Sequence, residues 1–191
     1  MPKNYSPDVT PPNQQRRPQN AMSDEWTREF LQRARIGHIA TRWDEQLFIT
    51  PTNFWYDPEQ HLIYFHSNIA GRIRANLERH PQVCFETSEW GRMLPSNIAL
   101  EFTIQYESAV VYGQVRVVEE EAEKCRALYG LIGKYFPGME PGKEYRPVTE
   151  KELLRTSVYA ISIDSWSGKR NWKERAIQSE DWPPLDETWF T

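Results

Sequence analysis

IYFHS at residues 63–67, followed directly by NIAGRIRANLERHP at residues 68–81, is the stretch of sequence that decides the fold prediction. The first part is β-branched and aromatic, which is typical of a strand. The second part has the Leu and Ile spacing of a helix, and the final proline ends that helix. The stretch therefore predicts a strand that ends in a His-Ser pair and leads into a helix with two arginines in its first turns.

The junction between this strand and helix carries groups that bind phosphate. Amide N–H groups at a helix start and the Ser67 hydroxyl can form a cradle, and the guanidinium groups of Arg72 and Arg74 add positive charge. His66 stands beside them at the end of the strand. Two interpretations fit these residues: a phosphorylated ligand is held here, or the segment is an ordinary strand-to-helix turn with solvated arginines.

Length and composition indicate one ordinary domain. A chain of 191 residues is long enough for a single hydrophobic core. The net charge is −4, and no block of like charge is longer than residues 119–121, so we expect no binding to nucleic acid or to an anionic membrane. No apolar run approaches the ~20 residues that span a bilayer, and no signal-type apolar region follows Met1. We therefore expect a soluble, cytoplasmic protein.

Cysteines and histidines are scattered along the chain. Cys84 and Cys125 form no C-x-x-C motif, and the four histidines show no H-x-x-x-H or H-E-x-x-H spacing. We predict no metal site, and both cysteines fit small core positions.

The order of patterns along the chain predicts a barrel. Residues 1–22 are rich in Pro, Asn and Gln and are predicted to be a mobile arm, and residues 23–165 are predicted to form the domain. Strand patterns cover residues 38–43, 47–56, 62–67, 82–88 and 157–164, with two further strands in 100–118 broken near Gly113. Helix patterns begin at Ser23 and cover 69–79, 119–136 and 149–155, and residues 90–99 are predicted as a loop. About six or seven strands with helices at the connections fit a closed or partly closed antiparallel barrel.

The tail at residues 166–191 carries four tryptophans, at positions 166, 172, 182 and 189. Four exposed indoles would make a mobile tail poorly soluble. We therefore expect this segment to dock on the barrel or on a partner subunit.

Several short motifs, in this order, resemble one known superfamily. They are Gly37-His38-Ile39-Ala40-Thr41, Thr50-Pro51-Thr52-Asn53-Phe54, Tyr64-Phe65-His66-Ser67, Gly71-Arg72 with Leu77 and Pro81, Tyr106-x-Ser108-x-Val110-x-x-Gly113, and Ser165 to Asn171. Between Ile36 and about Glu174 the chain resembles the pyridoxamine 5′-phosphate oxidase-like FMN-binding split-barrel superfamily, within it the nitroimidazole-resistance-type branch. The resemblance implies a mainly β fold with peripheral α-helices: an antiparallel, Greek-key-like split β-barrel.

The resemblance also implies FMN in a groove at a homodimer interface. His66, Ser67, Arg72 and Arg74 would then meet the phosphate and the ribityl chain. Thr41, Pro51, Thr52 and Asn53 would line the flavin ring. Trp166 and Lys169, contributed by the other subunit, would close the far side of the ring. No side chain is predicted as a catalytic acid or base, because the flavin itself carries the chemistry.

Two departures from the superfamily pattern bear on function. The superfamily commonly has a lysine directly after the arginine of the phosphate segment, and this chain has Ile73. The Arg-x-His substrate motif of true pyridoxamine phosphate oxidases is replaced by residues 171–175, which contain no histidine, so we do not expect vitamin B6 oxidation.

We expect an FMN-dependent oxidoreductase that passes electrons from a nicotinamide nucleotide to a small nitroaromatic or quinone acceptor. Two alternatives stay open: a flavin-binding or storage module without turnover, and a split-barrel dimer that binds another cofactor, such as deazaflavin F420 or haem.

Overall fold

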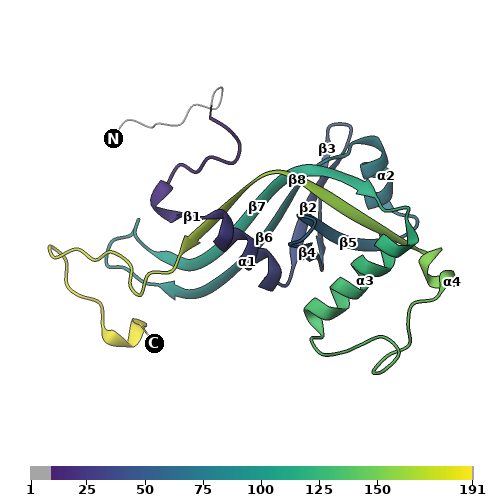
Figure 1. Cartoon of the computed structure of the whole chain (residues 1–191). Helices are drawn as coiled ribbons and strands as arrows, with labels where there is room; N and C mark the ends of the chain where they lie inside the picture. Colours follow the sequence, from purple (N-terminus) through teal and green to yellow (C-terminus); the bar gives the residue numbers. More distant parts are fainter. Residues whose placement is uncertain (1–9, 191) are drawn as a thin grey trace.

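The computed structural model describes residues 10–190, and Figure 1 shows their arrangement. Residues 1–9, which belong to the predicted mobile arm, lie outside the described residues. In chain order the elements are the 3₁₀ helix η1 (Pro18–Asn20), β1 (Ala21–Met22), α1 (Asp24–Arg33), β2 (Gly37–Trp43), β3 (Gln46–Thr52), β4 (Trp55–Asp57), β5 (Leu62–Asn68), α2 (Arg72–Arg79), β6 (Gln82–Leu94), β7 (Thr103–Val117), α3 (Glu121–Tyr135), α4 (Glu150–Leu153), β8 (Thr156–Asn171) and η2 (Glu187–Phe190).

The strands form one antiparallel sheet of eight strands, in the order β3-β2-β6-β7-β8-β5-β4, with β1 paired to β8. The terminal strands β3 and β4 are neighbours in sequence, so the chain passes from one end of the sheet to the other through Asn53 and Phe54. This arrangement is an open barrel with its gap at those two residues. The mainly β fold is therefore confirmed, whereas the single strand predicted over residues 47–56 is two strands.

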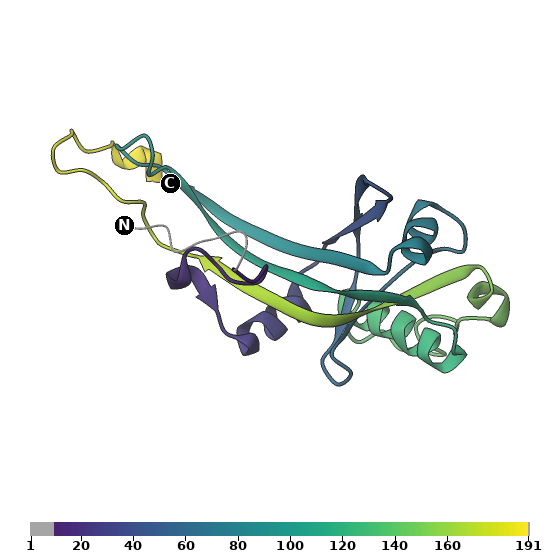
Figure 2. The same ribbon diagram turned by 90° about the horizontal axis from the view of Figure 1, so that it is seen from above.

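Three long strands, β6, β7 and β8, extend away from the barrel as a twisted ribbon (Figure 2). This ribbon corrects three predictions. β6 continues to Leu94 with a bulge between Trp90 and Met93, where a loop was predicted. β7 is one strand, and the predicted break near Gly113 is a register shift against β8. β8 runs to Asn171, past the predicted end at residue 164, because β7 and β1 pair with its second half.

The register shift in β7 gives a stability prediction. A Cβ atom added at Gly113 would lie 2.0 Å from the Ser162 carbonyl oxygen, a backbone atom that cannot rotate away. We expect Gly113→Ala to lower the free energy of unfolding by about 1–3 kcal/mol, as overpacking commonly does. Chemical denaturation measures the change. Gly133→Ala on α3 is the matched control, because its added Cβ meets nothing within 4 Å. Equal stability of Gly113→Ala and the unmodified protein would contradict the packing at the bulge.

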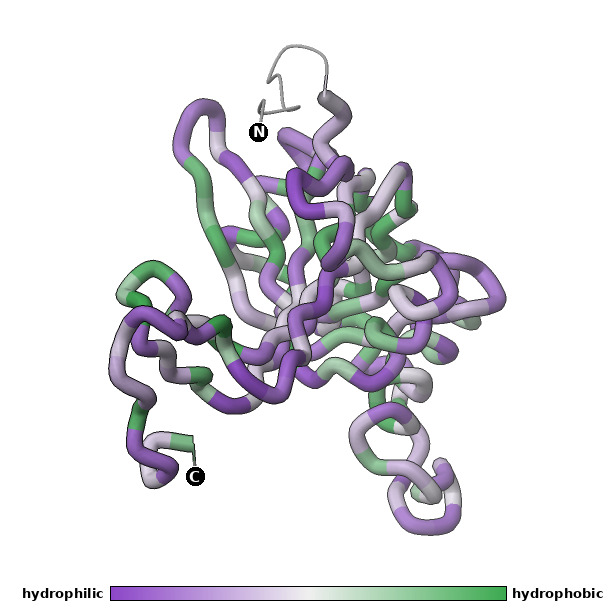
Figure 3. The backbone as a smooth tube through the Cα atoms, turned by 90° about the vertical axis from the view of Figure 1, so that its left-hand side faces the viewer, coloured by the Kyte–Doolittle hydropathy of each residue, from purple (hydrophilic) through white to green (hydrophobic). Residues whose placement is uncertain are grey.

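Alternation along β5 separates two packing layers. Phe65 lies in the core cluster inside the barrel, whereas Tyr64 lies in a second cluster with Ala127 of α3. Hydrophobic segments concentrate where the strands run side by side, and the projecting loops are mostly hydrophilic (Figure 3). Because neighbouring side chains of a strand point to opposite faces, His66 continues the Tyr64 face and Ser67 continues the Phe65 face.

The segment before α1 contains regular structure. β1 pairs with the second half of β8, the Gln15 side chain donates to the Gly168 carbonyl oxygen (3.2 Å), and Asn20 donates to the Tyr106 hydroxyl (3.3 Å). The prediction of a mobile arm therefore does not hold for the part from η1 to β1. No helix in the described part of the chain is long and apolar enough to cross a membrane.

Candidate cofactor site

The start of α2 has the geometry of an anion site. The helix was predicted from residue 69 but begins at Arg72, because the Asn68 carboxamide oxygen accepts a hydrogen bond from the Ala70 N–H (3.2 Å) and forms a turn. Gly71 precedes the helix with φ 148°, and no side chain caps it. A Cβ atom added at Gly71 would meet nothing within 4 Å, so the space beside Gly71 at the uncapped start of α2 is open.

Arg72 is the cation best placed at this helix start. Its exposed guanidinium lies over the rings of Trp43 (5.4 Å) and Phe48 (5.3 Å) and forms no ion pair with any of residues 10–190. Stacking of this kind fixes the orientation of the group and leaves its N–H donors available. The positive charge of Arg72 is therefore available to a ligand.

Ser67 and Arg74 lie near the same helix start but already have partners. The Ser67 hydroxyl donates to the Asn68 carbonyl oxygen (3.0 Å) and contacts the Tyr159 hydroxyl (3.2 Å). Arg74 is paired with Glu78 on α2 and donates to the Ser157 hydroxyl (3.1 Å). These bonds order the strand-to-helix junction, and the Glu78 carboxylate offsets the charge of Arg74.

His66 faces away from this helix start and lines a cavity of about 440 Å³ between α3, the loop that follows it and the end of β5. We call this space the His66 cavity. Its lining residues are Asn53, His66, Leu128, Tyr129, Leu131, Ile132, Tyr135, Phe136, Tyr145, Arg146, Val148, Glu152 and Thr156. The structure thus brings together Asn53 and His66 of the predicted set and separates His66 from Ser67.

The His66 imidazole is exposed to this cavity, and neither ring nitrogen bonds another residue within 10–190. The surrounding protein lowers the pKa of His66 by desolvating its charged form. At the edge of the cavity, Arg146 forms two hydrogen bonds to Glu152 (2.7 and 3.1 Å), and these bonds, with those from Thr149, lower the pKa of Glu152 to about 2. The cavity therefore combines a neutral imidazole, apolar walls and a charged rim.

Three predicted residues from β2 and β3 have different surroundings. Thr41 is only 3% exposed and accepts a hydrogen bond from the Asn76 side chain (2.9 Å), which ties β2 to α2 beneath the anion site. Pro51 is exposed on the edge strand β3, and the Thr52 hydroxyl donates to the Asn53 carbonyl oxygen (3.0 Å). Pro51 and Asn53 thus flank the gap in the barrel with accessible surface.

The two predicted residues of β8 point to opposite faces of the sheet. The Trp166 indole donates to Asp24 at the start of α1 (2.8 Å) and packs edge-on against His61. Lys169 lies on the other face, with its ammonium 5.2 Å from the Tyr106 ring centroid. A single ligand bound on one face of the sheet therefore cannot contact both Trp166 and Lys169 of the same chain.

Sequence reasoning did not identify the walls of the His66 cavity. Leu128, Tyr129 and Ile132 lie in the helix predicted over residues 119–136, but no contact with a ligand was predicted for them. Arg146 and Glu152 come from a loop and a short helix whose position depends on the tertiary fold. The available signal was the aromatic density of residues 129–136, which is unusual for an ordinary packing face.

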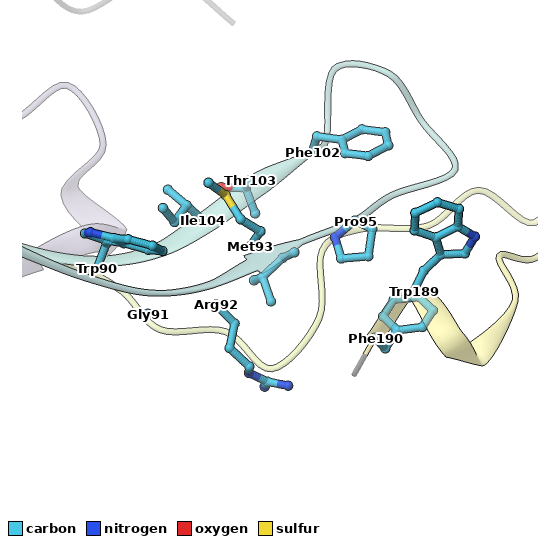
Figure 4. A pocket seen from close by; sticks show the side chains of 11 residues that line it. Trp90, Gly91, Arg92, Met93, Pro95, Phe102, Thr103, Ile104, Trp189 and Phe190 are labelled. Carbon is cyan, nitrogen blue, oxygen red and sulfur yellow. The ribbon is translucent and has the colours of Figure 1, made fainter.

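A larger groove of about 820 Å³ lies at the far end of the ribbon, where η2 faces β6 and β7 (Figure 4). Trp90, Met93, Phe102 and Trp189 contribute its exposed apolar surface. None of the residues predicted to contact a cofactor lines this groove. Among the described residues, no group of three or more His, Cys, Asp or Glu side chains could hold a metal ion.

Comparison with known proteins agrees with this fold. Residues 23–170 match the sequence profile of the pyridoxamine 5′-phosphate oxidase family, so the chain belongs to that family. No similar sequence was found among curated proteins. The resemblance stated from the sequence motifs is thereby confirmed.

Solved structures with the same fold include proteins that carry flavin and haem. The flavocytochrome Anf3 from Azotobacter vinelandii is 26% identical, with a TM-score of 0.74 over 85% of this chain and 74% of that chain. An FAD- and heme-binding protein from Mycobacterium smegmatis is 22% identical, with a TM-score of 0.70 over 87% and 76%. A protein assigned to 5-nitroimidazole antibiotic resistance, from Bacteroides thetaiotaomicron, is 20% identical, with a TM-score of 0.65 over 78% and 86%.

Proposed function

We propose that this protein binds a flavin, with the flavin phosphate at the start of α2. The observation that carries the proposal is the uncapped helix start at Gly71 together with the unpaired guanidinium of Arg72. A phosphate there would accept hydrogen bonds from the first amides of α2 and from Arg72. Family membership and the flavin named for the Azotobacter flavocytochrome support the same assignment.

FMN is the flavin that we propose, although FAD has the same riboflavin 5′-phosphate half and would use the same helix start. The proposed positions for the ring are Pro51 and Asn53 at the gap in the barrel, where accessible backbone and side-chain groups lie beside β3. The first measurement is the visible spectrum of the purified protein before and after addition of FMN and desalting. Chromatography of the released flavin then separates FMN from FAD.

We also propose a homodimer, since part of the sheet surface lacks cover within one chain. Ile49, Ala40 and Cys84 are successive partners across β3, β2 and β6, so they share one face of the sheet. Ile49 is 72% exposed, and Leu47 on the same face of β3 is 70% exposed. Apolar exposure on an edge strand favours a partner surface. Sedimentation analysis of the flavin-loaded protein tests this part of the proposal, and a monomer would overturn it.

The proposed activity is electron transfer from a nicotinamide nucleotide to a small nitroaromatic or quinone acceptor. A bound flavin would supply the redox chemistry by accepting a hydride and passing on two electrons. The protein's part would be to anchor the phosphate at Arg72, position the ring at the gap in the barrel and limit access of water. Anaerobic mixing with NADPH or NADH distinguishes this enzyme from a storage module, in which the flavin would stay oxidised.

A second candidate function is haem binding together with the flavin. The specific observation in its favour is the His66 cavity, which joins an unpartnered imidazole to apolar walls next to Asn53. The name flavocytochrome, carried by the Azotobacter structure, denotes the same combination of groups in a protein of this fold. Haem iron in proteins is commonly held by a histidine.

Arg72→Ala tests the phosphate position. Loss of one charged hydrogen-bonding partner should weaken FMN binding by about 1.5–3 kcal/mol, or roughly 10- to 150-fold. Fluorescence titration of FMN into apoprotein measures the change. Arg79→Ala is the matched control: it removes an arginine that also stacks on Trp43 (4.8 Å) but lies at the other end of α2. Equal affinity of Arg72→Ala and the unmodified protein would place the phosphate elsewhere.

A further inference from the structure

We infer that His66 is the axial ligand of a haem that occupies the His66 cavity. The inference rests on the proposed haem binding and goes further by assigning the ligand residue and the site. Four features of the cavity carry it: three concern the iron, the ring and the carboxylates of the haem, and the fourth concerns its position beside the flavin.

The first feature is the state of the imidazole. A ring nitrogen can coordinate iron only if its lone pair is available, and of the four histidines only His66 lines this cavity. His38 Nδ1 bonds Glu86 (3.0 Å), and His61 Nδ1 is shared by Arg28 and Tyr56 (3.1 and 2.9 Å). His66, in contrast, bonds no other residue of the described chain.

The second feature is the wall opposite β5. Helix α3 presents apolar and aromatic side chains to the cavity over two turns: Leu128, Tyr129, Leu131, Ile132, Tyr135 and Phe136. A planar apolar ring system of the porphyrin type gains most from a wall of this composition. The cavity volume of about 440 Å³ lies within the range for pockets that hold cofactors.

The third feature is the charged rim. A haem carries two carboxylates at one edge, and these remain near water when the ring is buried. Arg146 stands at the rim of the cavity with its side chain 62% exposed, so its guanidinium can reach an anion from the solvent side. The cavity is therefore apolar where the ring would lie, and the carboxylates would emerge beside Arg146, whose guanidinium is paired with Glu152 at the rim in this structure.

The fourth feature is the shared residue Asn53. It lines the His66 cavity and also stands at the gap between β3 and β4, where the flavin ring is proposed to lie. The segment between β3 and β4 would thus face the haem on one side and the flavin on the other. A haem held in the cavity would then lie next to the proposed flavin position and could accept electrons from reduced flavin.

The test is titration of hemin, ferric protoporphyrin IX, into the full-length protein, followed by visible spectroscopy. We expect saturation at one hemin per chain, with a Soret band that indicates nitrogen coordination. His66→Ala should weaken binding by about tenfold or more and change the spectrum. Added imidazole should restore the original spectrum in this variant, because it can replace the missing ligand. If His66 had only a structural role, added imidazole would not restore the spectrum of the variant.

His38→Ala is the matched control, because it removes a partly exposed imidazole on β2 that does not line the His66 cavity. It should leave the hemin titration unchanged. Equal hemin affinity and an unchanged spectrum in His66→Ala would overturn the inference. Hemin binding to the unmodified protein that never saturates would also overturn it, because such binding is adventitious adsorption. Flavin retention is measured on the same samples. Protein that keeps flavin but takes no hemin refutes the haem site alone, and protein that takes hemin through His66 but keeps no flavin refutes the flavin proposal alone.

Discussion

Phe85→Ala should lower the free energy of unfolding by about 3–5 kcal/mol. The side chain is fully buried in the barrel core, and its ring meets that of Phe54 edge to face with centroids 4.8 Å apart. On the other side the ring lies against Gly37, where an added Cβ would come within 2.2 Å of it. The Gly37 backbone lies against one side of the ring and has no side chain to fill the gap, so the core can collapse only partly into the space that truncation leaves.

Denaturant unfolding monitored by tryptophan fluorescence measures this loss. Phe102→Ala is the control, since it removes the same ring from a position that is 61% exposed. That change should alter the unfolding free energy by about 0.5 kcal/mol or less. If the two variants were destabilised equally, the assignment of Phe85 to the centre of the barrel would be wrong.

Local sequence patterns were sufficient to predict the strand and the helix that carry the candidate site. The β-branched run at residues 63–67 and the helix after it depend on short-range composition, and both occur in the structure. The helix predicted to begin at Ser23 is capped by the Ser23 side chain, and the helix predicted from residue 149 begins with a capping box of Thr149 and Glu152. In each case the stabilising hydrogen bonds join residues that are neighbours in sequence, so the sequence contains the whole signal.

Strand ends were less predictable, because pairing partners decide them. Residues 165–171 contain glycine, lysine and arginine and do not resemble a strand, yet they pair with β7 along their length, and Gly168 and Lys169 also pair with β1. Pairing on both sides therefore overrides weak β propensity. Trp166 consequently belongs to the barrel wall and packs on α1, whereas the sequence placed it in a tail.

The grouping of the candidate residues could be derived only in part. Strict alternation already places His66 and Ser67 on opposite faces of a strand, although their adjacency suggested a common ligand. Which face meets α3 and which meets the barrel core depends on the sheet order. The His66 cavity exists because a loop far along the chain, containing Arg146, returns to the end of β5.

The second large effect concerns pH. Lys134→Met should stabilise the protein at pH 6, and the gain should disappear as the pH approaches 10.5. The Lys134 ammonium lies 3.4 Å from the Phe54 ring centroid and donates to the Leu31 carbonyl oxygen (3.1 Å). No carboxylate of the described chain pairs with it, although Glu89 acts weakly at longer range. Burial therefore lowers the pKa of the Lys134 amine from its ordinary 10.5 to about 7.

The direction of the pH dependence follows from the number of protons that the folded and unfolded states bind. Between about pH 7 and 10.5 the amine is neutral in the folded protein and protonated in the unfolded chain, so the unfolded state binds more protons and stability rises with pH. Below pH 7 both states are protonated, and the folded protein carries the full cost of a buried cation, at most about 5 kcal/mol. Methionine fills a similar volume without charge and removes this cost at every pH.

Unfolding free energies of both proteins, measured from pH 6 to pH 10, test the prediction. Other groups titrate in this interval, including Cys84, whose pKa burial raises, so the slope of either protein alone is ambiguous. The difference between the two curves isolates Lys134, because every other group is common to both. A constant difference across this range would mean that the amine reaches solvent and keeps its ordinary pKa, which would in turn place it outside the pocket formed by Phe54 and Leu31.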